Sequence, residues 1–138
     1  MRGAVFADTG FWVARISPDD QLHNQARDAS RALNAALIVT SELVLVETLN
    51  TFSASGAFAR GRVARVIEAL LGDPQMEIVP QSPSLFTDAL ALYRERGDKA
   101  WSLTDCTSFV IMRKRKIEAA LTHDRHFEQA GFKALLRT

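Results

Sequence analysis

Residues 4–10 read Ala-Val-Phe-Ala-Asp-Thr-Gly, and this stretch decides how the rest of the chain is interpreted. Its four apolar residues predict a short strand that is buried on both faces, as in a parallel sheet. Asp8 follows directly where the apolar run ends. Ligands of open α/β sheets bind beyond the carboxyl ends of the strands, so a carboxylate here is well placed for chemistry. Asp-Thr-Gly is also ordinary turn sequence, and Asp8 taken alone could simply cap the turn.

Short apolar runs alternate with helical patterns along the whole chain. Strands are predicted at Ala4–Ala7, Leu37–Thr40, Met76–Val79, Glu118–Thr122 and Lys133–Leu136. Helices are predicted at Ser17–Asn34, Ser41–Phe52, Ala57–Leu71, Ser82–Arg96, Ser102–Lys116 and Arg125–Gln129, and Phe11–Ile16 is expected to form a short helix or a turn. Strands that alternate with helices are typical of α/β proteins with a parallel sheet. We therefore expect a single α/β domain over residues 1–138.

The second helix is expected to begin at Ser17. The stretch Ser17-Pro18-Asp19-Asp20 combines an N-cap residue, a proline suited to the first helical position, and two acids that favour the positive end of a helix. Its apolar stripe extends the predicted helix to Asn34. His23, close to the start of this helix, is expected to be an ordinary surface histidine.

The composition indicates an ordinary globular protein. Of the 138 residues 47% are hydrophobic, and no apolar run approaches the roughly 18 residues of a membrane span. No secretory signal precedes Asp8, and the single Cys106 cannot form an internal disulfide, so we expect a cytoplasmic protein without a membrane partner. The formal net charge is +1, which by itself does not indicate nucleic-acid binding.

Two later acids hold positions similar to that of Asp8. Asp124 follows the strand predicted at 118–122, so two strands deliver carboxylates to one edge of the sheet. Glu47 lies in the helix that follows the strand at 37–40. It shares a helix face with Leu43, Asn50 and Thr51, which is also what a half-exposed polar surface would look like. Glu47 is therefore a candidate whose functional and structural interpretations are balanced.

Asp105 lies near the start of the helix that begins at Ser102. Ser-x-x-Asp fits a capping box, in which the carboxylate serves only to start the helix. The helical spacing, however, places Asp105 on the same face as Phe109 and Met112. An acid on the apolar side of a helix needs a partner, and a metal cation is one that fits.

These positions converge on one edge of a parallel sheet. The acids concerned are Asp8, Glu47, Asp105 and Asp124. Clusters of carboxylates bind hard divalent cations, so we expect Mg²⁺ or Mn²⁺. Such a site suits cleavage of phosphodiesters, because a metal ion lowers the pKa of a bound water and offsets charge on the phosphate.

The sequence resembles the PIN-domain ribonucleases, and among them the VapC-type toxins of bacterial toxin–antitoxin pairs. The resemblance rests on Val5–Thr9, Thr40–Thr48, Ser102–Asp105, Leu121–Phe127 and Ala130–Phe132, in this order and spacing. It implies a three-layer α/β/α sandwich around a central, mainly parallel sheet of about five strands. The resemblance also implies RNA as the substrate, a cognate antitoxin as a partner, and a homodimer.

The resemblance assigns roles to individual residues. It makes Asp8, Glu47, Asp105 and Asp124 the metal-binding catalytic cluster, and Thr9, Ser102 and Thr122 the supporting hydroxyls. Gly10 and His123 differ from the usual residues of the family, so neither carries a catalytic prediction. We expect a basic rim to hold the RNA phosphates, with Arg60, Arg62, Arg65 and Arg125 as candidates.

Rival classes of α/β protein lack their key residues here. A phospho-receiver domain needs a second acid beside Asp8 and an acceptor Asp after the third strand, where Val79-Pro80 stands. A haloacid-dehalogenase phosphatase needs Asp-x-Asp after the first strand, but position 10 is Gly. An RNA-processing housekeeping nuclease of the PIN type and a non-catalytic interaction domain stay open as alternatives.

Overall fold

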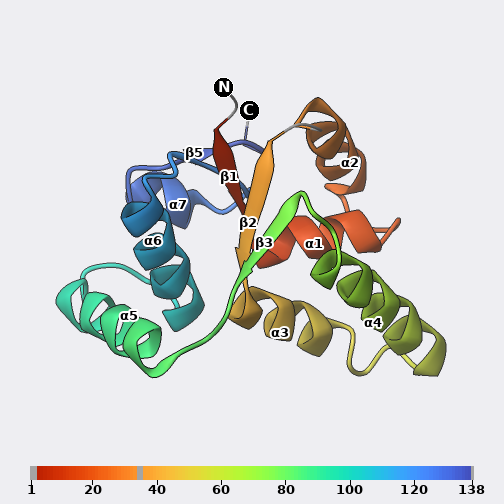
Figure 1. The fold of residues 1–138 in the computed structure, drawn as a ribbon, viewed down its shortest axis with the longest axis horizontal. Coiled ribbons are helices and arrows are strands. Elements are labelled where there is room, and N and C mark those ends of the chain that lie inside the picture. The colour runs from red at the N-terminus through yellow and green to blue at the C-terminus, as the bar shows by residue number, and fades with distance from the viewer. Residues whose placement is uncertain (1–2, 34–35, 138) are drawn as a thin grey trace.

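The computed structural model describes residues 3–33 and 36–137 (Figure 1). Within these ranges the strands form one sheet in the order β3-β2-β1-β4-β5, and all neighbouring strands are parallel. The strands are β1 (Ala4–Ala7), β2 (Leu37–Ser41), β3 (Met76–Val79), β4 (Ala119–Leu121) and β5 (Lys133–Ala134). The predicted parallel sheet of about five strands is confirmed.

Helices cover both faces of this sheet, which confirms the three-layer α/β/α sandwich (Figure 1). In chain order they are α1 (Thr9–Ile16), α2 (His23–Ala32), α3 (Glu42–Thr51), α4 (Ala57–Leu71), α5 (Pro83–Glu95), α6 (Leu103–Arg115) and α7 (Arg125–Gln129). Helices α1, α2 and α4 lie on one side, and α6 and α7 lie on the other with α5 packed against α6 (Figure 1).

The central strand is β1, the apolar stretch that directly precedes Asp8. Phe6 of β1 pairs with Val39 of β2 on one side and with Ala120 of β4 on the other. Phe6 and Ala7 are completely buried. A strand with neighbours at both edges and helices on both faces needs apolar residues throughout, and this explains the continuous apolar run.

The second helix begins six residues later than predicted, because α2 spans His23–Ala32. Residues 17–22 form turns instead, and the backbone N–H of Leu22 donates to Oδ1 of Asp20 at 2.9 Å. Such a bond from an Asp side chain two residues back is an alternative to the helix, so the acids of the predicted helix start serve a turn. The predicted end at Asn34 lies outside the described residues.

His23 is half-buried rather than a plain surface residue, which corrects the sequence-based expectation. Its Nδ1 atom lies 2.7 Å from the main-chain oxygen of Ala14, and this contact ties the start of α2 to α1. In the described part of the chain, every helix is too short or too polar to span a membrane. The single domain over residues 1–138 stays a prediction.

Candidate active site

A cavity of about 520 Å³ opens at the carboxyl ends of the central strands, and all four acids singled out in the sequence line it. Asp8 directly follows β1, and Asp124 stands just before α7 after β4. Glu47 comes from α3, which starts where β2 ends, and Asp105 comes from the first turn of α6. The chain thus brings together carboxylates that are far apart in the sequence.

Asp8 is one of two buried acids of the cavity, with Asp105 as the other. Burial raises its pKa to about 7, and the negative charges of Asp105 and Asp124 act in the same direction. The backbone N–H of Thr9 and the Thr122 hydroxyl oppose this shift, and the hydroxyl donates to Oδ2 of Asp8 at 3.0 Å. Asp8 stands at the N-cap of α1, but its side chain makes no capping hydrogen bond. The turn-capping interpretation of this residue is therefore not supported.

Asp105 has two roles at once. Its backbone N–H donates to the Ser102 hydroxyl at 3.0 Å, and its Oδ2 accepts from the Ser102 N–H at 3.0 Å, so the capping box is present. The same Oδ2 atom lies 2.9 Å from Nδ1 of His126 inside the cavity. Burial raises the pKa of Asp105, while the Ser102 N–H and His126 lower it. The two interpretations of this residue are not exclusive, because one carboxylate serves both the helix and the site.

Both carboxylate oxygens of Glu47 accept hydrogen bonds from threonine hydroxyls. Thr9 at the start of α1 donates to Oε1 at 3.0 Å, and Thr104 at the start of α6 donates to Oε2 at 2.6 Å. Glu47 therefore belongs to the cavity and not to a solvated helix face. Sequence reasoning named Thr9 but missed Thr104, although it lies in the quoted motif directly before Asp105.

Asp124 caps the short helix α7, since its Oδ1 accepts from the backbone N–H of His126 at 2.9 Å. The ring of His126 returns to the cavity, and Asp105, Asp124 and His126 each offer one ligand atom within 4.8 Å of the others. His126 was quoted in the sequence motif without a role. Its position two residues after Asp124, in the first turn of α7, is the signal that could have identified it.

The donor set of the cavity fits a hard divalent cation. It consists mainly of carboxylate oxygens, with one imidazole nitrogen from His126. Burial is the main cause of the raised pKa values of Asp8 and Asp105, and the neighbouring acids add to it, so a cation bound beside these carboxylates would lower both pKa values. Thr9 and Thr122 hold carboxylates in place, whereas the Ser102 hydroxyl accepts from the backbone.

The arginines predicted to form a basic rim do not belong to the lining of this cavity, and their binding of phosphate stays a prediction. Among the described residues that line it there is no lysine or arginine. Arg60 instead donates to the main-chain oxygen of Ser53 at 2.9 Å, and Arg62 donates to that of Ile16 at 2.6 Å. The walls of the site therefore favour cations over anions.

Known proteins share this architecture. The "23S rRNA-specific endonuclease VapC20" of Mycobacterium tuberculosis, from strains CDC 1551 / Oshkosh and ATCC 25618 / H37Rv, is 28% identical over 128 residues, which are 93% of this chain and 95% of the relative. The crystal structure of Mycobacterium tuberculosis VapC20, described as a Sarcin-Ricin loop cleaving toxin, matches with a TM-score of 0.81 at 26% identity. This match covers 93% of this chain and 95% of the other.

A family model decides the assignment. The model of the PIN domain matches residues 5–133, a range that contains all four acids of the cavity together with His126. The order of the strands, the place of the acids and the sequence match agree, and the chain therefore belongs to the PIN-domain family.

Proposed function

We propose that this protein is a metal-dependent endoribonuclease and the toxin of a type II toxin–antitoxin pair. The observation that carries the proposal is the cavity at the carboxyl edge of a PIN-domain sheet, lined by carboxylates from β1, α3, α6 and the loop after β4. The relatives named as an rRNA endonuclease and as a toxin support the choice of RNA and of the toxin class. The alternatives are a housekeeping RNA-processing nuclease and a non-catalytic interaction domain.

The proposed cofactor is Mg²⁺ or Mn²⁺. Asp8 and Asp105 are the proposed main ligands, and Glu47 and Asp124 complete the set directly or through water. When bound, the ion supplies positive charge for the phosphate and lowers the pKa of the attacking water. We propose His126 as an orienting residue, because its ring contacts Asp105 and its backbone N–H contacts Asp124.

Two carboxylates of the cavity, Glu47 and Asp124, are proposed to position the attacking water. Glu47 has both oxygens fixed by hydroxyls from two different helices, so its carboxylate is held in one orientation. Asp124 is more exposed than Asp105, with side-chain exposures of 39% and 11%. Glu47 and Asp124 are therefore the proposed groups that orient the attacking water, since Asp124 faces solvent and Glu47 is rigid.

The decisive experiment compares RNA cleavage with and without divalent metal. The purified chain should cleave a mixture of labelled single-stranded and structured RNAs in Mg²⁺ or Mn²⁺, and cleavage should stop in excess EDTA. Asp8→Ala should be inactive in every buffer while still folding. Equal cleavage in excess EDTA, or by Asp8→Ala, would contradict the proposal.

The biological role needs a separate test. Expression of the chain alone should slow growth of the host, and co-expression of the neighbouring open reading frame should relieve this effect. The proposed homodimer and cytoplasmic location can be checked on the same strain by size-exclusion chromatography and cell fractionation. Absence of toxicity and of a co-purifying partner would favour the housekeeping nuclease.

A further inference from the structure

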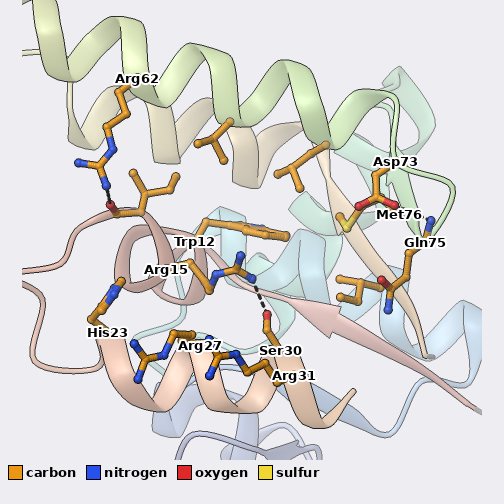
Figure 2. A pocket seen from close by; sticks show the side chains of 14 residues that line it. Trp12, Arg15, His23, Arg27, Ser30, Arg31, Arg62, Asp73, Gln75 and Met76 are labelled. Carbon is orange, nitrogen blue, oxygen red and sulfur yellow. Dashed lines mark hydrogen bonds between the residues drawn. The ribbon is translucent and has the colours of Figure 1, made fainter. Parts of the chain in front are cut away.

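A second cavity, of about 700 Å³, lies between α1, α2 and α4 (Figure 2). Its floor is largely apolar and includes Trp12, which Figure 2 shows among the lining side chains. Four arginines line it: Arg15 from α1, Arg27 and Arg31 from α2, and Arg62 from α4. The described residues thus gather positive charge from three helices around one opening.

This positive charge is only partly compensated. Asp73 is the one acid among the described residues that line the cavity. Two of the guanidinium groups bind uncharged oxygens, since Arg15 donates to Ser30 Oγ at 2.5 Å and Arg62 donates to the main-chain oxygen of Ile16. Arg27 lies 3.8 Å from Asp28 in an exposed ion pair, which adds little. The hydrogen bonds orient the arginines without neutralising them.

Helix α1 connects this cavity to the acidic one. Thr9 and Gly10 at the start of α1 line the acidic cavity, and Trp12, Arg15 and Ile16 line the arginine cavity. A helix of eight residues is about 12 Å long, which corresponds to a few nucleotides of an extended single strand. The start of α2 also joins the two cavities, since Leu22 lines the acidic cavity and its neighbour His23 lines the arginine cavity.

We propose that Arg15, Arg27, Arg31 and Arg62 bind backbone phosphates of a single-stranded segment of the RNA substrate, a few nucleotides from the cleaved bond. The inference rests on the proposed nuclease function. Guanidinium groups bind phosphate through paired hydrogen bonds, and an unpaired strand can place a base over an apolar floor. The described residues that line the acidic cavity include no lysine or arginine, so the adjoining arginine cavity would supply the positive charge that the RNA backbone needs.

The test uses Arg27→Gln/Arg31→Gln, because these side chains are exposed and lie one turn apart on α2. The fold should tolerate the change, since the Arg27–Asp28 ion pair is exposed and contributes little. The control is Arg94→Gln/Arg113→Gln, which removes the same charge from exposed positions on α5 and α6, across the sheet. Binding of a labelled single-stranded RNA is measured in EDTA at several salt concentrations. Cleavage of the same RNA is measured in Mn²⁺.

Loss of two phosphate contacts should make the negative slope of log affinity against log salt shallower by about 1.4. This corresponds to roughly 20-fold weaker binding at 0.1 M salt. For RNA cleavage, the α2 variant should have a higher KM than the wild type and an unchanged kcat. The lost contacts bind the RNA equally well in the ground state and in the transition state. The control variant should match the wild type in the salt slope and in KM, apart from the small effect of its lower net charge.

Equal slopes and equal KM values for the α2 variant and the control would overturn the inference. Unchanged RNA binding together with lost binding of a synthetic acidic amphipathic peptide would also overturn it, in favour of a protein ligand. A wild type that binds RNA through these arginines but never cleaves it supports the phosphate-binding role of the arginines and refutes the proposed function, together with the placement of the arginines relative to a cleaved bond. A wild type that cleaves RNA with arginine-independent binding refutes the inference alone, and one that does neither refutes both.

Discussion

At the scale of one residue, the raised pKa of Asp8 lowers the stability of the fold near neutral pH. Its pKa is raised from 3.8 to about 7, first by burial. Between these values the folded chain binds a proton that the unfolded chain has already lost. Folding stability therefore falls as pH rises from about 4 to about 7, by about 1.4 kcal/mol for each unit of difference in pKa.

Asp8→Asn should remove this pH dependence. In EDTA, urea unfolding of the wild type and the variant should give similar stability near pH 4, and the variant should become the more stable one as pH approaches 7. Above pH 7 the difference should stay constant. A difference between the two proteins that is the same at pH 4.5, 6 and 8 would contradict the raised pKa.

Asp105 allows the helix cap and the site to be separated. Asp105→Asn keeps an oxygen that can accept from the Ser102 N–H but removes the charge, so it should abolish cleavage and melt higher than the wild type in EDTA. Ser102→Ala removes the hydroxyl that accepts from the Asp105 N–H, and should cost about 1 kcal/mol with or without Mg²⁺. An Asp105→Asn variant that is less stable in EDTA yet still active would show that only the cap matters.

The residues that sequence reasoning missed share one property. Thr104 contacts Glu47 across 57 positions, and His126 contacts Asp105 across 21. Asp8, Asp105 and Asp124 could be proposed because each stands where an apolar run ends or a helix begins, which is a local signal. A hydroxyl or imidazole that completes a site from another element carries no such signal, because its role depends on how the elements pack.

At the scale of elements, the strands and most helices follow from local patterns, and α2 shows the limit. The predicted helix 57–71 is α4 with the same bounds, and the predicted strand 76–79 is β3. The start at Ser17 failed because Ser-Pro-Asp-Asp suits a turn as well as a helix, and Asp20 bonds to Leu22 instead. These four residues by themselves allow either form, and the structure has the turn.

Glu47 joins three elements, because the side chain from α3 accepts from Thr9 of α1 and Thr104 of α6. Thr9→Val/Thr104→Val should release this carboxylate and lower kcat by about 10- to 100-fold, with only a small loss of stability. Thr51→Val is the matched control, because the Thr51 hydroxyl donates to the main-chain oxygen of Glu47 and not to its carboxylate. If the control loses as much activity as the double variant, the carboxylate contacts are not what positions Glu47.

At the scale of the whole molecule, a net charge of +1 conceals a strong separation of charge. The cavity at the carboxyl edge of the sheet collects acids, and the cavity between α1, α2 and α4 collects arginines. Composition could not predict this division, because charges add over the chain whereas the fold sorts them. The same sorting would let a nearly neutral chain attract both the proposed divalent cation and the proposed RNA backbone.

The metal should stabilise the whole fold, because the acidic cluster exists only when β1, α3, α6 and α7 are assembled. A ligand that binds the folded chain alone adds about 2.7 kcal/mol at a hundred times its dissociation constant. The melting temperature of the wild type should therefore rise with added Mn²⁺ or Mg²⁺. Asp8→Asn and Asp105→Asn should lose most of this rise, whereas Arg27→Gln/Arg31→Gln should keep it, since those arginines line the other cavity. A metal-dependent rise that survives in both Asp variants would place the cation outside the acidic cluster and remove the basis for the proposed chemistry.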